Sequence, residues 1–486
     1  MNRIHAAFLG VFAIATVAAC GGGGGSGGGS PLGILPTPTS TPTVTPKCAS
    51  GTASVRNALH APQRPPAVEP QALHPQAAPT SAGQGKIRHV VVIVQENRSF
   101  DNLFSGFPGA DSATYGFTHT GQKVNLQPVG LEFFGDLDHE RHGWQVEYDN
   151  GKMDGFDQEF VIGANLPPCF AYSYVPHNET TVYWTLASNY ALADRMFESD
   201  SSGSFAAHQY LIAAQSAGVV GSPDNVPWGC DAPAGTITEL GGPGGTLLPG
   251  PYPCFTYATL ATSLDTAKLG WYFYTPSFVG SSPYYDVGGL LWSSFDAIKE
   301  VRSGPDWARN VISPNSQILS DIANNRLPAV SWVMPTFEDS DHPRSDSATG
   351  GPTWVGGIVN AIGKSSAWSS TAIFILWDDW GGWYDHVPPP QLDLVGLGFR
   401  VPAIIVSPYA RHHFVTHQQH EYGSIVRFIE GVYGLPSLGQ SDDRAAGMDD
   451  AFDFTQSPGP YQPVTLPQSR SRRAPQTLDL QPPDND

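Results

Sequence analysis

Acidic and amide side chains follow two apolar runs of the sequence, at the point where each run ends. Glu96 and Asn97 come directly after the first run, and Asp378 and Asp379 come directly after the second. Carboxylate and amide oxygens are the ligands that Ca²⁺, Mg²⁺ and Mn²⁺ prefer in proteins. Two adjacent carboxylates repel each other unless a cation lies between them or one is protonated. Each pair alone would also fit a polar turn, but together they predict a site for one divalent cation.

A serine-rich segment offers a nucleophile. Residues 200–210 are expected to form a loop that enters a helix near Ser204. The N-terminus of a helix presents unpaired N–H groups and a partial positive charge, which attract phosphate oxygens. A serine at this place can attack phosphorus if a metal lowers the pKa of its hydroxyl. The commoner role of serine there is that of an N-cap, and Ser201 and Ser202 compete with Ser204 on sequence alone.

Histidines are the candidates for proton transfer. His342 follows an apolar run and has acids beside it, and His139 follows Asp138. An imidazole near a leaving oxygen can donate a proton, and a cationic one stabilises phosphoryl charge. His386 is a candidate for orienting one of the two adjacent acids from outside the metal shell.

The elements that must position these residues alternate between strands and helices. Such alternation predicts an α/β fold with a mainly parallel central sheet and helices on both faces, in which ligands bind beyond the carboxyl ends of the strands. The Gly- and Pro-rich segment 218–253 is expected to lie above that edge. The predicted strands are 90–94, 270–274, 329–334, 372–376 and 401–406, and the predicted helices are 181–193, 204–214, 354–362 and 423–433.

Length and charge restrict the class of protein. A chain of 486 residues suggests two or three domains, or one large α/β domain with appendages. The net charge of −19 argues against a nucleic-acid partner, because binding to the phosphate backbone relies on basic surface. It does not exclude a small phosphate ester held by a metal ion and backbone amides.

The first residues indicate export. A weakly basic start and an apolar stretch of small residues over 6–18 are typical of a signal peptide, and the sequence Val-Ala-Ala-Cys over 17–20 resembles a bacterial lipobox. We expect Cys20 to carry lipid and to anchor the protein to the cell envelope. The alternative is an ordinary signal peptide cleaved near Ala19, which would give a secreted protein.

Composition then divides the rest of the chain. Residues 21–85 are Gly-, Ser-, Pro- and Thr-rich and predict a disordered tether, residues 86–456 a catalytic domain, and residues 457–486 a disordered tail. Besides Cys20 there are four cysteines, which allow three pairings in an exported protein. Cys230 and Cys254 bracket a Gly/Pro-rich loop and are the favoured pair.

Four motifs in this order resemble the bacterial phosphoesterase family that contains acid phosphatases and phosphatidylcholine-type phospholipases C. The similarity covers about residues 86–456, and Glu-Asn-Arg-Ser-Phe-Asp is its most specific part. The motifs are Glu-Asn-Arg-Ser-Phe-Asp at 96–101, Asn-Gly-Lys-Met-Asp-Gly-Phe at 150–156, Asp-His-Pro at 341–343 and Asp-Asp-Trp-Gly-Gly-Trp-Tyr-Asp-His-Val at 378–387.

The resemblance implies a fold similar to that of alkaline phosphatases, with one metal ion and a serine or threonine nucleophile. It assigns Ser204 as the nucleophile, and His139 and His342 as the residues that contact the phosphoryl group or protonate the leaving group. The sequence departs from the family pattern at Ala206 and Ala207, where Pro and Asn are common, and at Asp379, where Glu is common. The residues that match the metal or phosphate shell are Glu96, Asn97, Ser204, Asp378 and Asp379.

The expected activity is that of an exported, metal-dependent phosphoric-ester hydrolase with a phosphoserine intermediate. The compact chain, without C-terminal sandwich domains, favours the acid-phosphatase-like branch. A phospholipase C is the alternative, and would need an aromatic cage for choline. A non-catalytic surface lipoprotein with a degenerate site is a further alternative. The aromatic residues that could build the cage are Trp377, Trp380, Trp383 and Tyr384.

Overall fold

The computed structural model describes residue 48 and residues 81–133, 135–163, 166–277, 287–343 and 348–467. The expected signal peptide and lipobox, nearly all of the expected tether and the end of the expected tail lie outside these residues. Among the helices of the described chain, none has the length and apolarity needed to cross a bilayer.

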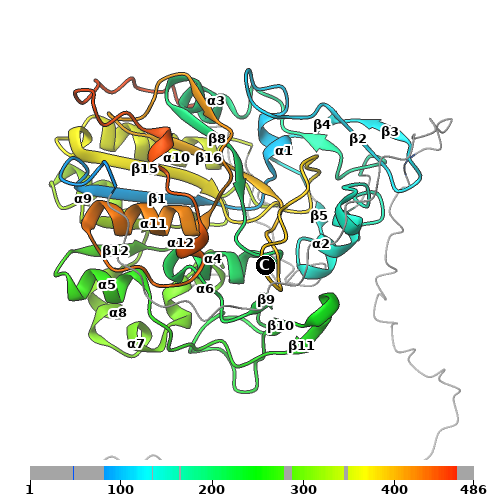
Figure 1. Cartoon of the computed structure of the whole chain (residues 1–486), viewed down its shortest axis with the longest axis horizontal. Coiled ribbons are helices and arrows are strands. Elements are labelled where there is room, and N and C mark those ends of the chain that lie inside the picture. Colours follow the sequence, from blue (N-terminus) through cyan, green and yellow to red (C-terminus); the bar gives the residue numbers. More distant parts are fainter. Residues whose placement is uncertain are drawn as a thin grey trace, which may run out of the picture. The chain divides into compact units, whose positions relative to one another are not determined.

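A nine-stranded sheet forms the centre of the described chain (Figure 1). Its order is β13-β12-β14-β1-β15-β16-β8-β17, with β18 also paired to β8. All pairings in this sheet are parallel except those of β16 with its two neighbours, so the predicted mainly parallel sheet is confirmed. The strands are β1 (His89–Gln95), β8 (Ala191–Phe197), β12 (Trp271–Tyr274), β13 (Val311–Ile312), β14 (Val330–Val333), β15 (Thr371–Trp377), β16 (Arg400–Val406), β17 (Phe414–Thr416) and β18 (His420–Glu421).

Helices cover both faces of the sheet. Figure 1 shows α3 and α10 on one side of the strands and α4 and α11 on the other. Each group also packs within itself, because α3 contacts α10 and α4 contacts α11. The helices are α1 (Phe100–Phe104), α2 (Arg141–Tyr148), α3 (Thr181–Asn189), α4 (Ser204–Ala213), α5 (Leu260–Thr266), α6 (Gly288–Leu291), α7 (Lys299–Arg302), α8 (Pro305–Asn310), α9 (Gln317–Ala323), α10 (Gly350–Gly363), α11 (Tyr422–Tyr433) and α12 (Ser441–Arg444).

Short strands build small sheets outside the central one. The segment expected above the carboxyl edge, 218–253, contributes a three-stranded sheet in the order β11-β10-β9. The pairs β2–β3, β4–β7 and β5–β6 form two-stranded sheets. Their bounds are β2 (Tyr115–Phe117), β3 (Lys123–Asn125), β4 (Gln127–Pro128), β5 (Gly135–Leu137), β6 (Val161–Gly163), β7 (Ser173–Tyr174), β9 (Val219–Gly221), β10 (Glu239–Gly241) and β11 (Leu247–Pro249).

Strands β1 and β15 are adjacent, and both are apolar on both faces. All seven residues of β15 are buried, as are the last six of β1. A continuous run of β-branched and large apolar residues is what a strand covered by helices on both sides requires. The five predicted strands all match strands of this sheet within about two residues at each end, the precision expected of such predictions.

The prediction of a helix over 181–193 placed its C-terminal end too far along the chain. Helix α3 stops at Asn189, and the chain then enters β8 at Ala191. The residues 191–193 are Ala, Leu and Ala, which favour helix locally. In the fold they pair with β16 on one side and with β17 on the other, and this pairing outweighs the local preference.

The packed chain extends further than the predicted catalytic domain. Residues 457–467 belong to the described chain, although we expected disorder from residue 457 on. Val464 is buried, and its backbone N–H donates to the side chain of Asn360 on α10. The four remaining cysteines form two disulfides, Cys48–Cys169 and the favoured pair Cys230–Cys254.

The centre of the sheet gives a test of stability. Ile375 lies in the middle of β15 with none of its surface exposed. We expect Ile375→Ala to lower the free energy of unfolding by about 2–5 kcal/mol, because lost burial and a cavity add together. The matched control is Leu319→Ala on α9, whose side chain is 45% exposed, for a change within about 0.5 kcal/mol. Urea unfolding followed by tryptophan fluorescence measures both; equal effects would contradict the burial of β15.

Candidate active site

The in-register pairing of β1 with β15 brings the first acids together. Gln95 is paired with Trp377, so the two strands end side by side and the next residues are Glu96 and Asp378. Both carboxylates are fully buried. The imidazole of His208, on α4, lies between them, with Nε2 3.2 Å from Glu96 Oε1 and 3.3 Å from Asp378 Oδ2.

Ser204 is the first residue of α4, and Gly203 is its N-cap. The hydroxyl of Ser204 therefore does not cap the helix. It donates to Asp379 Oδ2 at 3.1 Å and accepts from Asn97 Nδ2 at 3.3 Å. Asn97 Nδ2 also donates to Asp379 Oδ2 at 3.1 Å. The structure thus brings the five predicted metal-shell residues Glu96, Asn97, Ser204, Asp378 and Asp379 into one buried cluster.

A tight backbone contact holds the ends of the two strands together. Asn97 has a left-handed backbone with φ of 55°, and its N–H donates to Asp378 Oδ1. Gly381 faces it with φ of 64°, and a Cβ at Gly381 would stand 2.2 Å from the carbonyl oxygen of Asn97. Only glycine can therefore occupy this position, which explains one glycine of the Asp-Asp-Trp-Gly-Gly motif.

Sequence reasoning assigned no role to His208. The signal that could have found it is its spacing, because a residue four positions after Ser204 lies on the same face of a helix. Glu96, His208 and Asp378 offer ligand atoms that all lie within 4.8 Å of one another. Two carboxylates and an imidazole form a donor set that suits a divalent cation such as Mn²⁺ or Mg²⁺, so the residues present fit the expected metal.

Hydrogen bonding controls the charge of this cluster. Burial would raise the pKa of Asp378, but the hydrogen bonds that it accepts, first of all from His208, hold that pKa below its ordinary value. Asp378 is therefore ionised at neutral pH and available as an anionic ligand.

The two predicted histidines lie together. The rings of His139 and His342 meet edge to face, with centroids 5.7 Å apart. Nδ1 of His139 bonds to the carbonyl oxygen of Leu137, and Nδ1 of His342 bonds to that of Pro343. When Nδ1 donates to a carbonyl, Nε2 is the nitrogen that gains or loses a proton, so both rings are set to exchange a proton through Nε2. The His139 carbonyl also lies beside Gly203, one residue before Ser204.

The aromatic residues of the Asp-Asp-Trp motif support the loop from within. Trp377, Trp380 and Trp383 have none of their surface exposed. The indole N–H of Trp377 donates to Asp341, that of Trp380 donates to Glu147, and the ring of Trp383 packs under the Arg98 guanidinium at 4.9 Å. These contacts explain the three rings as structural supports, and none of the three offers an open face to the choline cage that the phospholipase C alternative would need.

His386 does not orient Asp378 or Asp379, as we had considered. Its Nδ1 bonds to Asp101 Oδ2 at 2.6 Å, and its Nε2 lies 3.1 Å from Asp111 Oδ1. Asp101 and Asp385 also surround the buried guanidinium of Arg400, which donates to both oxygens of Asp385. The group links the Glu-Asn-Arg-Ser-Phe-Asp and Asp-Asp-Trp motifs by ion pairs, with Arg400 as the cation between the acids.

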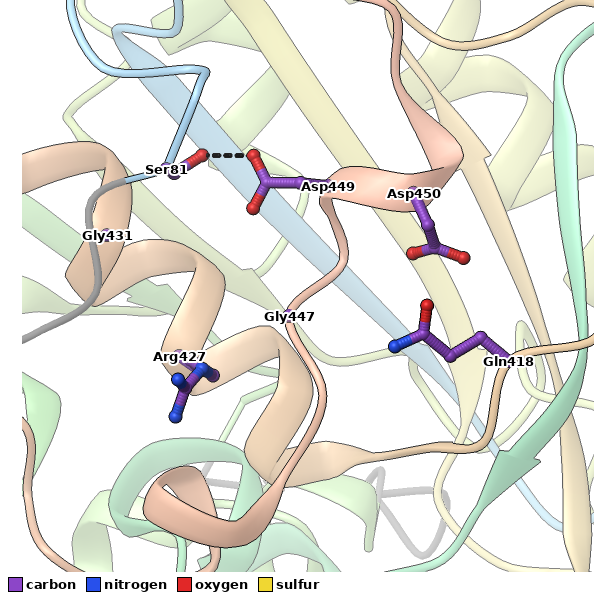
Figure 2. A pocket seen from close by; sticks show the side chains of 7 residues that line it. All are labelled: Ser81, Gln418, Arg427, Gly431, Gly447, Asp449 and Asp450. Atoms are coloured by element: carbon purple, nitrogen blue, oxygen red, sulfur yellow. Dashed lines mark hydrogen bonds between the residues drawn. The ribbon is translucent and has the colours of Figure 1, made fainter.

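A polar cavity of about 340 Å³ lies elsewhere, over α11 (Figure 2). Arg427 borders it but donates to the carbonyl oxygens of Asp442 and Asp443, and Asp449 accepts from Ser81. None of the predicted site residues lines this cavity. Its lining residues are Ser81, Gln418, Arg427, Gly431, Gly447, Asp449 and Asp450.

A serine hydroxyl at a helix N-terminus, beside acids and imidazoles at the carboxyl edge of a parallel sheet, is the arrangement of a hydrolytic centre in an α/β protein. The chain belongs to the Phosphoesterase family, whose sequence profile matches residues 87–436. It is therefore a hydrolase of phosphoric esters, and the family resemblance drawn from the four motifs is confirmed.

Proteins similar to this chain include several phospholipases C. The chain is 26% identical over 454 residues to phospholipase C B of Mycobacterium tuberculosis, across 80% of this chain and 81% of that protein. It is 27% identical over 443 residues to non-specific phospholipase C3 of Arabidopsis thaliana, across 80% and 78%. Among solved structures it is similar to a protein in the alkaline phosphatase superfamily from Vibrio parahaemolyticus, with a TM-score of 0.38, 11% identity and coverage of 79% and 76%.

The His386 ion pairs predict a pH dependence of stability. Burial alone would lower the pKa of His386, but Asp101 and Asp385 raise it from 6.5 to about 9. A pKa that is higher in the folded state adds stability below pH 6.5, and this contribution disappears as the pH rises through 9. We expect the difference in unfolding free energy between wild type and His386→Gln to shrink from pH 6 to pH 9.5 in urea titrations. The exposed His412→Gln is the control, and a difference that does not change with pH would contradict the pairing.

Proposed function

We propose that the protein is a metal-dependent phosphoesterase in which Ser204 is the nucleophile and a phosphoserine is the intermediate. The observation that carries this proposal is the position of the Ser204 hydroxyl. It stands at the first residue of α4, within hydrogen-bonding distance of Asp379 and Asn97 and next to the group Glu96, His208 and Asp378.

In the first step, the attack of Ser204 on phosphorus, different side chains have different roles. The hydrogen bond to Asp379 directs the Ser204 hydroxyl and gives its proton an acceptor as Oγ attacks phosphorus. The first N–H groups of α4 and the amide of Asn97 stabilise the equatorial oxygens, on which negative charge grows. Glu96, His208 and Asp378 would hold the cation, which lowers the pKa of the serine hydroxyl and neutralises phosphoryl charge when bound.

His342 or His139 completes the reaction. A protonated Nε2 gives its proton to the departing alcohol oxygen, and the same imidazole then takes a proton from the water that attacks the phosphoserine. Asp379 returns the serine proton to Oγ as the bond between Oγ and phosphorus breaks. The carboxyl group of Asp341, the residue before His342, is engaged elsewhere, because it accepts from the Tyr183 hydroxyl and from the Trp377 indole.

Phosphomonoesters are the first candidate substrates, as in the acid-phosphatase-like branch. The buried packing of Trp377, Trp380 and Trp383 supports this choice, because none of these rings is open to a choline group. Phospholipase C activity is the second candidate, favoured by the names of the relatives. A non-catalytic lipoprotein is disfavoured by the convergence of all five predicted metal-shell residues in one cluster.

Ser204→Ala tests the nucleophile. We expect turnover of p-nitrophenyl phosphate to fall by roughly 10³-fold or more, because no other hydroxyl takes the place of Oγ. Ser201→Ala is the control, since the Ser201 hydroxyl bonds to the carbonyl of Val395, and its activity should stay near that of wild type. Full activity of Ser204→Ala would refute the assignment. In the same assays, faster turnover of p-nitrophenylphosphorylcholine by the wild type would select the phospholipase C candidate.

Removal of metal tests the cation and the role of His208. We expect a chelator to abolish turnover and Mg²⁺, Mn²⁺ or Ca²⁺ to restore it. His208→Gln should bind the restoring ion roughly 10–100-fold more weakly, since one ligand or its orientation is lost. Calorimetric titration of the metal-free proteins measures this independently of activity. An unchanged affinity in His208→Gln would remove His208 from the metal site.

A further inference from the structure

A second group of acids lies in the segment that leads into the nucleophile. Strand β8 ends at Phe197, and residues 198–203 connect it to Ser204. Every residue of this connection is buried, including Glu198 and Asp200, which have none of their surface exposed. Neither acid is among the five residues that match the family's metal shell.

The carboxyl groups of Glu198 and Asp200 have only each other as hydrogen-bond partners within the described chain. No other donor in this part of the chain bonds to any of their four carboxylate oxygens, and the buried hydroxyl of Ser202 also has no partner. Arg141 is the nearby cation, but its Nη1 donates to the backbone carbonyls of Ser201 and Val395 instead. Buried carboxylates without donors are costly unless a proton or a metal ion neutralises them.

One oxygen of Glu198 and one of Asp200 lie beside Gly398. A Cβ added at Gly398 would stand 2.2 Å from Glu198 Oε2 and 2.4 Å from the carbonyl oxygen of Asp200. The backbone of Gly398 is not left-handed, so glycine is needed there for space and not for its conformation. The Glu198 and Asp200 carboxyl groups also lie within hydrogen-bonding reach of each other. Carboxylate and carbonyl oxygens are the hard ligands that Ca²⁺ or Mg²⁺ prefers.

We propose that Glu198 and Asp200 bind a second divalent cation, separate from the one held by Glu96, His208 and Asp378. This cation would tie Glu198 to Asp200 at the start of the connection. Because Asp200 is only four residues before Ser204, the ion would also fix the approach of the chain to the nucleophile. The proposal goes beyond the proposed function and does not depend on it.

Electrostatics is consistent with a bound ion. Without one, burial raises the pKa of Asp200 to about 8, and burial together with Asp200 and Asp379 raises that of Glu198 well above its ordinary value. A cation would let both groups ionise at neutral pH, as ligands require. The competing explanation is that the two carboxyl groups share a proton.

Metal counting tests the proposal. The full chain, freed of metal and then dialysed against Ca²⁺ or Mg²⁺ alone, should hold two equivalents by elemental analysis. Glu198→Gln and Asp200→Asn should each hold one equivalent, and Asp378→Asn should also hold one. The matched control is Glu430→Gln, a buried carboxylate on α11 that accepts from the Leu438 N–H, which should keep both.

The outcomes separate this site from the first one. A wild-type protein that binds one equivalent, retained in Glu198→Gln, would overturn the proposal in favour of the shared proton. A single equivalent that is lost in Glu198→Gln and kept in Asp378→Asn would support the second site and contradict the proposed catalytic metal. Thermal unfolding in chelator shows whether each variant folds. If Glu198→Gln or Asp200→Asn does not fold, the wild type and Asp378→Asn decide. A wild type that holds one equivalent, together with an Asp378→Asn variant whose unfolding temperature does not rise when the cation is added, also overturns the proposal.

Discussion

The pairing of β1 with β15 is the constraint on which the site depends. Parallel strands in register must end at the same level, and here both ends carry acids. A shift of one residue would move Glu96 and Asp378 to different faces of the sheet, because side chains alternate along a strand. The apolar runs before them therefore do more than fill the core, since their burial on both faces fixes the register and so the distance between the carboxylates.

This arrangement concentrates negative charge where no water can screen it. Glu96, Asp378 and Asp379 are buried at one end of the sheet, with Glu198 and Asp200 close to them. Two kinds of compensation appear in the fold. Arg400 neutralises Asp101 and Asp385 by fixed ion pairs, whereas Glu96 and Asp378 face the imidazole of His208. Fixed protein cations therefore hold the supporting network, and the acids nearer to Ser204 are the ones that we propose to bind a metal ion.

Much of the fold could be predicted because its signals are local. Continuous apolar runs predicted the strands, and the Ser204 segment predicted helix α4. The part that could not be predicted is set by tertiary pairing. Ala191–Ala193 favours helix by composition and becomes a strand only between β16 and β17, and no local pattern shows that β16 runs opposite to its neighbours. In the site, acids at strand ends were found from sequence, but His208 was missed, because its spacing of four from Ser204 shows only that both lie on one helix face and not that this face meets the acids. The partner of His386 was assigned wrongly because Asp101 is distant in sequence and near in space.

The reversed direction of β16 has a consequence for how the site end of the molecule is built. The chain leaves the sheet after Trp377 and returns at Arg400 on the same edge, so the segment between them needs no crossover to the far side. A parallel strand at this position would have presented its first residue at the opposite edge. Because β16 is reversed, its first residue, Arg400, lies at the edge where β15 and β8 end, and its guanidinium supplies a positive charge there. Insertions between 388 and 399 would therefore lengthen a loop at the site end of the sheet without altering the pairing of β15 with β16.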